Sequence, residues 1–347
     1  MTEKVAWIDC TKSIALFFII CTHSFDYNPL INMITGFVIP VFFIMYGFTH
    51  NNEKYRYKLQ VLYRKRFKSI MIPFLILTIS IVILYYFFYP LIDIGYSPEE
   101  YTYWLIYGNG PPVWVSHLWF LKALFFAIVL FTVIDRILHD KNISFRLFLI
   151  LFLPLFSVYL KDLLNVYLMI GGIDSIFIGT SFLLIGNEIK KIQGLNHWSI
   201  NTRIDVLLFV LLTPIMLFLG YVNGFANIGA SLYGNSILLH MTSGILGAYV
   251  IGLISYHLCK FERIKSALVS FNQYGQEIYE IHPFLTKWDF WIFKNFQILN
   301  LLNGVIVSWI ISSQVIDRSR ILKFIFTGNT RTSMRKSVDE LEEQQSN

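Results

Sequence analysis

Long apolar runs recur along the whole chain, and they constrain its fold more than any other feature. Several reach 18 residues or more, the length at which an α-helix can cross a hydrocarbon core about 30 Å thick. Hydrophobic residues make up 55% of the 347 residues and charged residues only 14%, whereas soluble domains carry about 25% charged residues. The sequence therefore predicts an all-α fold, a polytopic integral membrane helix bundle.

The apolar runs predict about ten transmembrane helices, at residues 6–24, 31–50, 69–90, 114–134, 147–160, 171–189, 204–220, 237–258, 268–285 and 299–316. The first run contains charged residues and lacks a small-residue cleavage site, so we expect a transmembrane helix rather than a signal peptide. The fifth run is short and the ninth is unusually polar. We expect a membrane-embedded domain at 1–316 and a tail at 317–347 that begins with an amphipathic stretch and is partly disordered.

The distribution of basic residues predicts the orientation of these helices. With the N-terminus in the cytoplasm, 23 of the 28 lysines and arginines fall in inside segments, three in outside loops and two within spans. This asymmetry follows the positive-inside rule and predicts that both termini are cytoplasmic. The net charge of +6 then indicates no nucleic-acid partner, because inside loops facing membrane lipid account for it.

Three ionisable residues lie in the first expected helix: Asp9, Lys12 and His23. Such residues are costly inside a membrane and are functional candidates by default. Asp9 and Lys12 are three residues apart, and Lys12 and His23 are eleven apart, so all three share one face, with about 16 Å between the last two. A structural ion pair of Asp9 with Lys12 is the alternative for Asp9. For Lys12 and His23 the sequence favours a functional role.

Further polar residues are expected at the outer side of the membrane. His117, His240 and His282 all fall near outer helix ends, where they could form a polar chamber with His23. Taken singly, each such histidine is more often interfacial or packed. Glu277 and Glu280, three apart in the ninth expected span, must face protein or water, and a buried structural network is an equal alternative for them.

The segment before the third expected span is strongly basic. Arg64, Arg66 and Lys68 lie there and could bind the phosphates of a cytoplasmic coenzyme. The alternative is ordinary positive-inside charge. No metal site is predicted, because the three cysteines, Cys10, Cys21 and Cys259, form no CxxC pair. The sequence also lacks a glycine-rich phosphate-binding motif.

Four segments together resemble the acyltransferase-3 family of membrane acyltransferases. WIDCTKSIALFFIICTHS is similar to the family's opening pattern, and FVIPVFFIMYGF followed by YRKRFKSIMIPF is similar to its second span and the basic stretch after it. HLWFLKALF resembles its His-Leu-Trp-Phe-Leu element, and YGQEIYEIHPF its late Ile-Tyr-x-x-His-Pro element. The chain departs from the family at Lys12, where arginine is common, and at Ser69, Lys122 and Glu280.

The resemblance implies a surface-polysaccharide or sugar O-acetylase with acyl-CoA, usually acetyl-CoA, as co-substrate and no permanently bound cofactor. It implies His23 as the essential residue and Lys12 as its basic partner. Histidine suits such chemistry because its pKa lies near operating pH, and it could act as general base or as acyl carrier. Asp9 and Asp26 are candidate orienting residues, Asp26 only if the first helix extends that far.

The expected reaction path runs across the membrane. The donor would be held on the cytoplasmic side, and the glycan acceptor would enter from outside, near candidate chamber residues His117, Trp119, Tyr279 and His282. The expected location is a bacterial plasma membrane. A transporter or flippase for a polysaccharide or lipid-linked glycan is the alternative, since it predicts the same spans, inside charge and polar interior.

Overall fold

The described part of the chain is almost entirely helical. A computed structural model describes residues 5–89, 95–111, 116–139, 143–194, 198–286 and 296–330. Within these ranges the strands are β1 (Ala226–Asn227) and β2 (Leu232–Tyr233), which pair antiparallel. The predicted all-α class is therefore confirmed.

The described helices follow one another along the chain from Ala6 to Thr327. The first eight are α1 (Ala6–Ser24), α2 (Pro29–Thr35), α3 (Val38–Thr49), α4 (Asn52–Tyr55), α5 (Leu59–Arg66), α6 (Ile72–Phe88), α7 (Pro98–Tyr107) and α8 (Trp119–Ile137). The others are α9 (Ile143–Leu164), α10 (Ile173–Gln193), α11 (Thr202–Asn223), α12 (Ile237–Leu258), α13 (Glu262–Gln273), α14 (Gly275–Thr286), α15 (Gln297–Leu302), α16 (Ser308–Ile310) and α17 (Arg320–Thr327).

Short turns of other helix types connect some of these elements. The π-helical turn η1 (Phe67–Met71) joins α5 to α6, and η5 (Asn303–Val307) and η6 (Ile311–Ile316) extend α15 and α16 into one stretch. The 3₁₀ turns are η3 (Ile170–Gly172) and η4 (Ile228–Ala230). Such turns keep the backbone hydrogen-bonded, as a membrane interior requires.

Eight helical stretches of the described chain are long and apolar enough to cross a membrane. They coincide with eight of the ten expected spans, and α9, where a short span was expected, is 22 residues long. The fourth expected span is α8, which has 19 residues and carries Lys122, Asp135 and Arg136. The chain is thus a multi-pass helical bundle.

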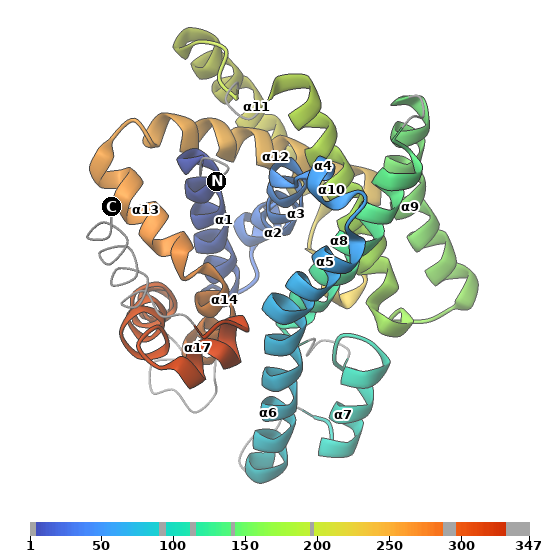
Figure 1. Ribbon diagram of the computed structural model, residues 1–347, viewed down its shortest axis with the longest axis vertical. Coiled ribbons are helices and arrows are strands. Elements are labelled where there is room, and N and C mark those ends of the chain that lie inside the picture. Colours follow the sequence, from blue (N-terminus) through green and yellow to red (C-terminus); the bar gives the residue numbers. More distant parts are fainter. Residues whose placement is uncertain are drawn as a thin grey trace.

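The ninth expected span is not one helix. The prediction of a continuous helix at 268–285 was wrong, because the chain leaves helical geometry at Tyr274 (φ −106°, ψ 17°) and forms α13 and α14, each of 12 residues. The break falls in the sequence NQYGQ, where asparagine and glycine are weak helix formers. Both halves pack against α1 (Figure 1).

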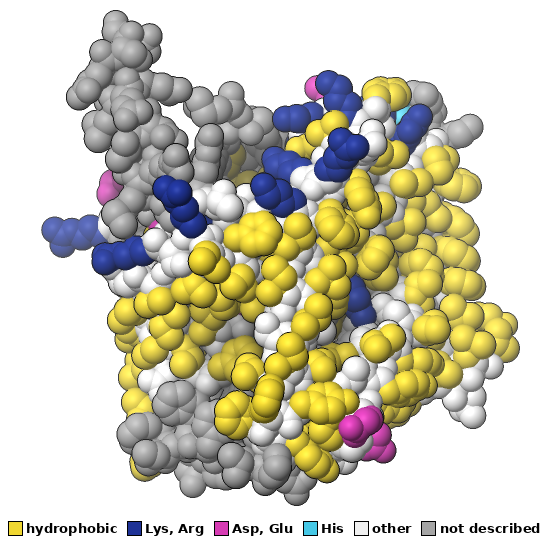
Figure 2. All heavy atoms as spheres, turned by 60° about the horizontal axis from the view of Figure 1, so that its bottom comes forward, with side chains coloured by type: hydrophobic (Ala, Val, Ile, Leu, Met, Phe, Trp, Pro, Cys, Tyr) yellow, Lys and Arg dark blue, Asp and Glu magenta, His cyan; other side chains and the backbone are white. Residues whose placement is uncertain are grey.

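The helix ends predicted to be cytoplasmic meet at one end of the bundle. Asp135 of α8 accepts hydrogen bonds from Arg56, after α4, at 3.2 Å and from Arg146 of α9 at 3.4 Å. Arg146 also lies 3.0 Å from Glu188 of α10, so four chain segments are joined there. On the face drawn in Figure 2, lysine and arginine side chains gather at the top, and a broad apolar band lies below them.

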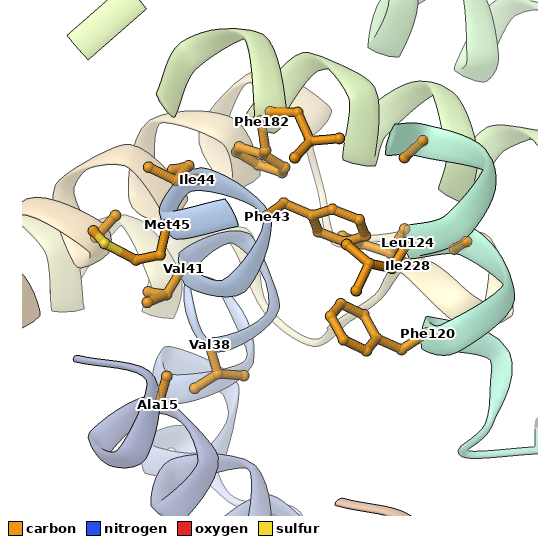
Figure 3. Packing of buried hydrophobic residues seen from close by; sticks show 14 of the residues in the cluster. Ala15, Val38, Val41, Phe43, Ile44, Met45, Phe120, Leu124, Phe182 and Ile228 are labelled. Carbon is orange, nitrogen blue, oxygen red and sulfur yellow. The ribbon is translucent and has the colours of Figure 1, made fainter. Parts of the chain in front are cut away.

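The centre of the bundle is a close crossing of α3 and α10. A Cβ built on Gly47 would overlap the carbonyl oxygen of Leu183, and one built on Gly186 would overlap that of Ile44. Small residues let two helix backbones approach this closely in a membrane. In Figure 3, Phe43 points from α3 toward α8, where its ring meets Phe120 edge-on at 5.2 Å.

Candidate active site

The first helix positions the residues singled out from the sequence. It packs against α3, α12, α13 and α14, so most of its surface faces protein. Asp9, Lys12 and His23 are all partly buried. The helix ends at Ser24, and the backbone N–H of Phe25 closes the last turn by donating to the carbonyl of Cys21 at 3.0 Å. The shared face predicted from helical spacing therefore exists.

At the inner end of this face Asp9 and Lys12 make different contacts. The Asp9 carboxylate accepts a hydrogen bond of 2.9 Å from the Asn272 amide of α13. Lys12 has no hydrogen bond or ion pair to any described residue, and the charged groups that act on it electrostatically are Asp9 and Arg66. Asp9 and Lys12 therefore form no direct ion pair that would explain the lysine. An ammonium inside a span without a direct partner is costly.

The three basic residues proposed to bind the donor have different surroundings. Arg64 and Lys68 are exposed, whereas Arg66 is partly buried. The Arg66 guanidinium lies over the Tyr46 ring, 4.9 Å from its centroid, and its Nε has no hydrogen-bond partner among the described residues. Of the three, Arg66 is therefore the one directed toward Lys12 and the interior.

At the outer end, two histidines from distant parts of the sequence meet. The rings of His23 and His282 lie edge to face with centroids 5.1 Å apart, and His282 is fully buried. Its Nδ1 is 3.0 Å from the carbonyl oxygen of Ile278. Because a carbonyl can only accept, Nδ1 carries the hydrogen, and Nε2 of the neutral ring is left as an acceptor. No described residue bonds to this Nε2.

His117 and Tyr279 complete this histidine cluster, defined as His23, His117, Tyr279 and His282. The Tyr279 ring lies 6.0 Å from that of His282 and 6.3 Å from that of His117. The Tyr279 hydroxyl donates to the backbone carbonyl of His117, whose own Nε2 is 3.1 Å from the carbonyl of Glu280. The segment before α8 is thus tied to α14.

Two other expected chamber residues lie apart from this cluster. Trp119 packs under Gly229, where a Cβ would overlap its indole ring. Its ring lies 6.0 Å from that of Phe120, which in turn lies 5.5 Å from that of Tyr279. His240 lies against Phe182, 6.1 Å between ring centroids.

The helical geometry invoked for Asp26 does not occur. The first helix stops at Ser24, so spacing along a helix cannot place Asp26 below His23. Its carboxylate is exposed and accepts a hydrogen bond of 2.7 Å from Gln297, at the start of α15.

The two carboxylates of α14 are both buried, and Glu277 forms an ion pair with Lys323 of α17.

Sequence reasoning gave no role to Tyr46 and Asn272, which the fold places at the inner end of the α1 face. The only signal for Tyr46 is a tyrosine near the end of an otherwise apolar run. Asn272 stands in the polar stretch before α14, without a pattern that names its partner. Within the described ranges, no three histidine, cysteine, aspartate or glutamate side chains gather as a metal site would need.

The comparisons with known proteins give one match. A family model described as an acyltransferase domain covers residues 5–313, which include α1, both halves of the ninth expected span and every member of the histidine cluster. No curated protein and no solved structure matches the chain.

Proposed function

Because this chain belongs to the acyltransferase-3 family of membrane acyltransferases, as its match over residues 5–313 shows, we propose that it acylates an envelope glycan. The donor is cytoplasmic acyl-CoA, with acetyl as the acyl group. The acceptor is a hydroxyl of a cell-envelope or exported glycan, and the enzyme works in a bacterial plasma membrane.

One observation carries this proposal. The single helix α1 connects a basic inner site, Lys12 with Arg66 nearby, to the histidine cluster at its outer end. A coenzyme with phosphates at one end and a thioester at the other end of a flexible arm fits this arrangement. Arginine and lysine bind phosphates, and histidine can accept the proton of a hydroxyl.

On the donor side, Arg66 and Lys12 receive the phosphates, with exposed Arg64 and Lys68 adding positive charge at the entrance. The Lys12 ammonium, which has no partner among the described residues, gains one when the donor binds. Binding thus compensates the cost of a lysine in this position. The arm then lies along the α1 face toward His23, about 16 Å further along the helix axis.

In direct transfer, His23 acts as the general base. It takes the proton of the acceptor hydroxyl while the hydroxyl oxygen attacks the thioester carbonyl. The carbon–sulfur bond then breaks, and the proton passes from His23 to the leaving thiolate, so the products are an ester and free coenzyme A. General base catalysis of this kind contributes about 10²- to 10⁴-fold in rate.

In covalent transfer, His23 acts as a nucleophile instead. Its neutral ring attacks the thioester, coenzyme A leaves as the thiol, and the acyl-imidazole is then attacked by the acceptor hydroxyl. The two routes are distinguished by whether labelled acyl group stays on the protein when donor is added without acceptor.

The acceptor approaches from the outer side. His117, Tyr279 and His282 line this approach, and the Nε2 of His282, to which no described residue bonds, accepts a hydrogen bond from a sugar hydroxyl. Aromatic rings with a few polar atoms are typical of small-molecule sites.

The deciding experiment uses purified, reconstituted protein with acetyl-CoA labelled in the acetyl group. Label should appear on envelope glycan only when protein and glycan are both present. Absence of label, together with loss of glycan export in cells lacking the protein, would favour a transporter instead. Release of free label without ester formation would contradict the glycan acceptor.

A further inference from the structure

The helix α17 lies outside the region that matches the family, which ends at residue 313. It follows the last membrane span and packs back onto the bundle against α6, η1 and α14 (Figure 1). Its end is tightly fitted, because a Cβ on Gly328 would overlap the carbonyl oxygen of Lys68. An element beyond the matched region therefore contacts the helix that carries His282.

The contact is centred on a buried ion pair. Lys323 Nζ lies 2.6 Å from Glu277 Oε1 of α14 and 2.9 Å from Asp317 Oδ1. The Glu277 side chain is 2% exposed and that of Lys323 13%. The same ammonium lies over the Tyr274 ring, 5.6 Å from its centroid. Tyr274 is the residue at which the ninth span breaks.

The charge on Lys323 persists at neutral pH. Burial disfavours the ammonium, but the attraction of Glu277 and its hydrogen bonds to Glu277 and Asp317 outweigh that cost and raise the pKa of Lys323 above its ordinary value. Breaking a buried pair on one side only leaves an uncompensated charge. Glu277 is thus held against α17 as long as Lys323 is present.

A second contact fixes the next turn of α14. The Gln276 amide donates to the carbonyl of Phe326 in α17 at 2.9 Å and to that of Ser69 in η1 at 3.2 Å. It also lies 3.1 Å from Glu280 Oε1. Residues 276 and 277 open the helix whose next turns carry Tyr279 and His282, so α17 holds α14 from its first turn.

We propose that Lys323 is a positioning residue for acyl transfer: through its ion pair with Glu277, α17 sets the place of α14 and so of His282 beside His23. The inference rests on the proposed function in one respect, the assignment of His23 as the reacting residue. Lys323 itself touches no member of the histidine cluster. Its effect passes through the rigid helix α14, and small displacements of a positioned group can cost up to about 100-fold in rate.

The first test compares ion-pair variants of the full-length protein. Lys323→Met removes the charge but keeps the length, Lys323→Arg keeps the charge, and Glu277→Gln/Lys323→Met removes both charges. Lys265→Met is the matched control, because Lys265 pairs at 2.6 Å with Glu262, whose side chain is 79% exposed. Acetyl transfer is measured per folded protein, with kcat and KM for acetyl-CoA separated.

Lys323→Met should lower kcat about tenfold or more and change KM for acetyl-CoA less than about threefold. Lys323→Arg should recover most of kcat, and Lys265→Met should match the wild type. The double variant should remain as low in kcat as Lys323→Met, because it also lacks the ion pair; it still decides if Lys323→Met folds poorly, because it does not leave the Glu277 carboxylate unpaired. An unchanged kcat in Lys323→Met, a loss that only follows folded protein, or a double variant with near wild-type kcat would each overturn the proposal.

A second test reads the position of α14 without turnover. A Cβ on Gly275 would lie 3.9 Å from Leu16 Cδ2 of α1, so cysteines at these two positions, with Cys10, Cys21 and Cys259 replaced, should react with a short bifunctional thiol reagent. Lys323→Met and the double variant should both slow this crosslinking several-fold, and Lys323→Arg should restore it. Equal crosslinking in all variants would overturn the positioning role. If the variants change crosslinking as expected but the wild type transfers no acetyl group, the result would count against the proposed function alone.

Discussion

The His282 imidazole meets the His23 imidazole edge to face, 5.1 Å between centroids, although one ring comes from the first helix and the other from α14. Burial and the hydrogen bond from Nδ1 to the Ile278 carbonyl fix the His282 ring. The His23 ring therefore has a rigid neighbour, and the chemistry assigned to it can be tested one atom at a time.

Substitution of His23 separates a reacting residue from a structural one. His23→Gln keeps hydrogen bonding and approximate size but cannot take up a proton near neutral pH, so acetyl transfer should fall about 10²- to 10⁴-fold. His23→Ala should be equally inactive. Initial rates in purified, quantified protein measure this, and a near wild-type rate in His23→Gln would remove the catalytic assignment.

Lys12 should tolerate only a basic replacement. Lys12→Arg keeps a cation at the inner end of the α1 face and should retain substantial activity, as the family commonly has arginine there. Lys12→Ala should lose most of it, since a charge-assisted contact contributes about 1.5–3 kcal/mol. The measurement is KM for acetyl-CoA in Lys12→Arg and Lys12→Ala. Equal KM values in the two variants would contradict a contact between Lys12 and the donor.

Arg66 and Arg64 offer a matched comparison two residues apart. Arg66 is partly buried over Tyr46, whereas Arg64 is exposed. Arg66→Gln should raise KM for acetyl-CoA about tenfold or more, and Arg64→Gln should raise it much less because solvent screens exposed charges. Similar effects in the two variants would show that the basic segment acts only through its total charge.

The close crossing of α3 and α10 predicts where the fold is least tolerant. Gly186→Ala would force its Cβ into the carbonyl of Ile44, and such overpacking costs about 1–3 kcal/mol. Gly275→Ala is the control, because its Cβ would meet only ordinary contacts. Thermal unfolding in detergent should show a lower midpoint for Gly186→Ala alone; an unchanged midpoint would contradict the packing.

The orientation of the chain is open to direct test. Reporters placed after Glu53 or at the C-terminus should report the cytoplasm, and a reporter in the segment 91–113 should report the outside, because basic residues favour the inside. Finding residue 53 outside would reverse the orientation, and with it the direction assigned to acyl transfer.

Much of the fold follows from local sequence, since helix length and apolarity report burial in a membrane directly. The common face of Lys12 and His23 was likewise predictable, because helical spacing holds over the whole of α1. The break at Tyr274 was not, since the polar residues around it are compatible with either a broken or a continuous helix. The end of α1 at Ser24 agrees with the first predicted span, 6–24. The role offered for Asp26 required a longer helix, so it does not apply.

Tertiary contacts explain the rest of what the sequence left open. The pairing of Glu277 with Lys323 depends on how α17 folds back, and no spacing within either segment encodes it. The same holds for His23 and His282, whose proximity came only as an expectation from their common depth. The two residues of each pair lie far apart in the chain, so a pattern within one stretch of sequence cannot predict the pairing.

The stiffness of α1 has a consequence for which thioesters the enzyme uses. Lys12 and His23 are fixed to one helix, so the interval between the group proposed to bind phosphate and the group proposed to react cannot shorten or lengthen to suit a ligand. Such a helix selects substrates by length: a carrier with a shortened arm can reach Lys12 or His23, but not both at once. Discrimination among acyl carriers would then reside in arm length, before any contact with the acyl group itself.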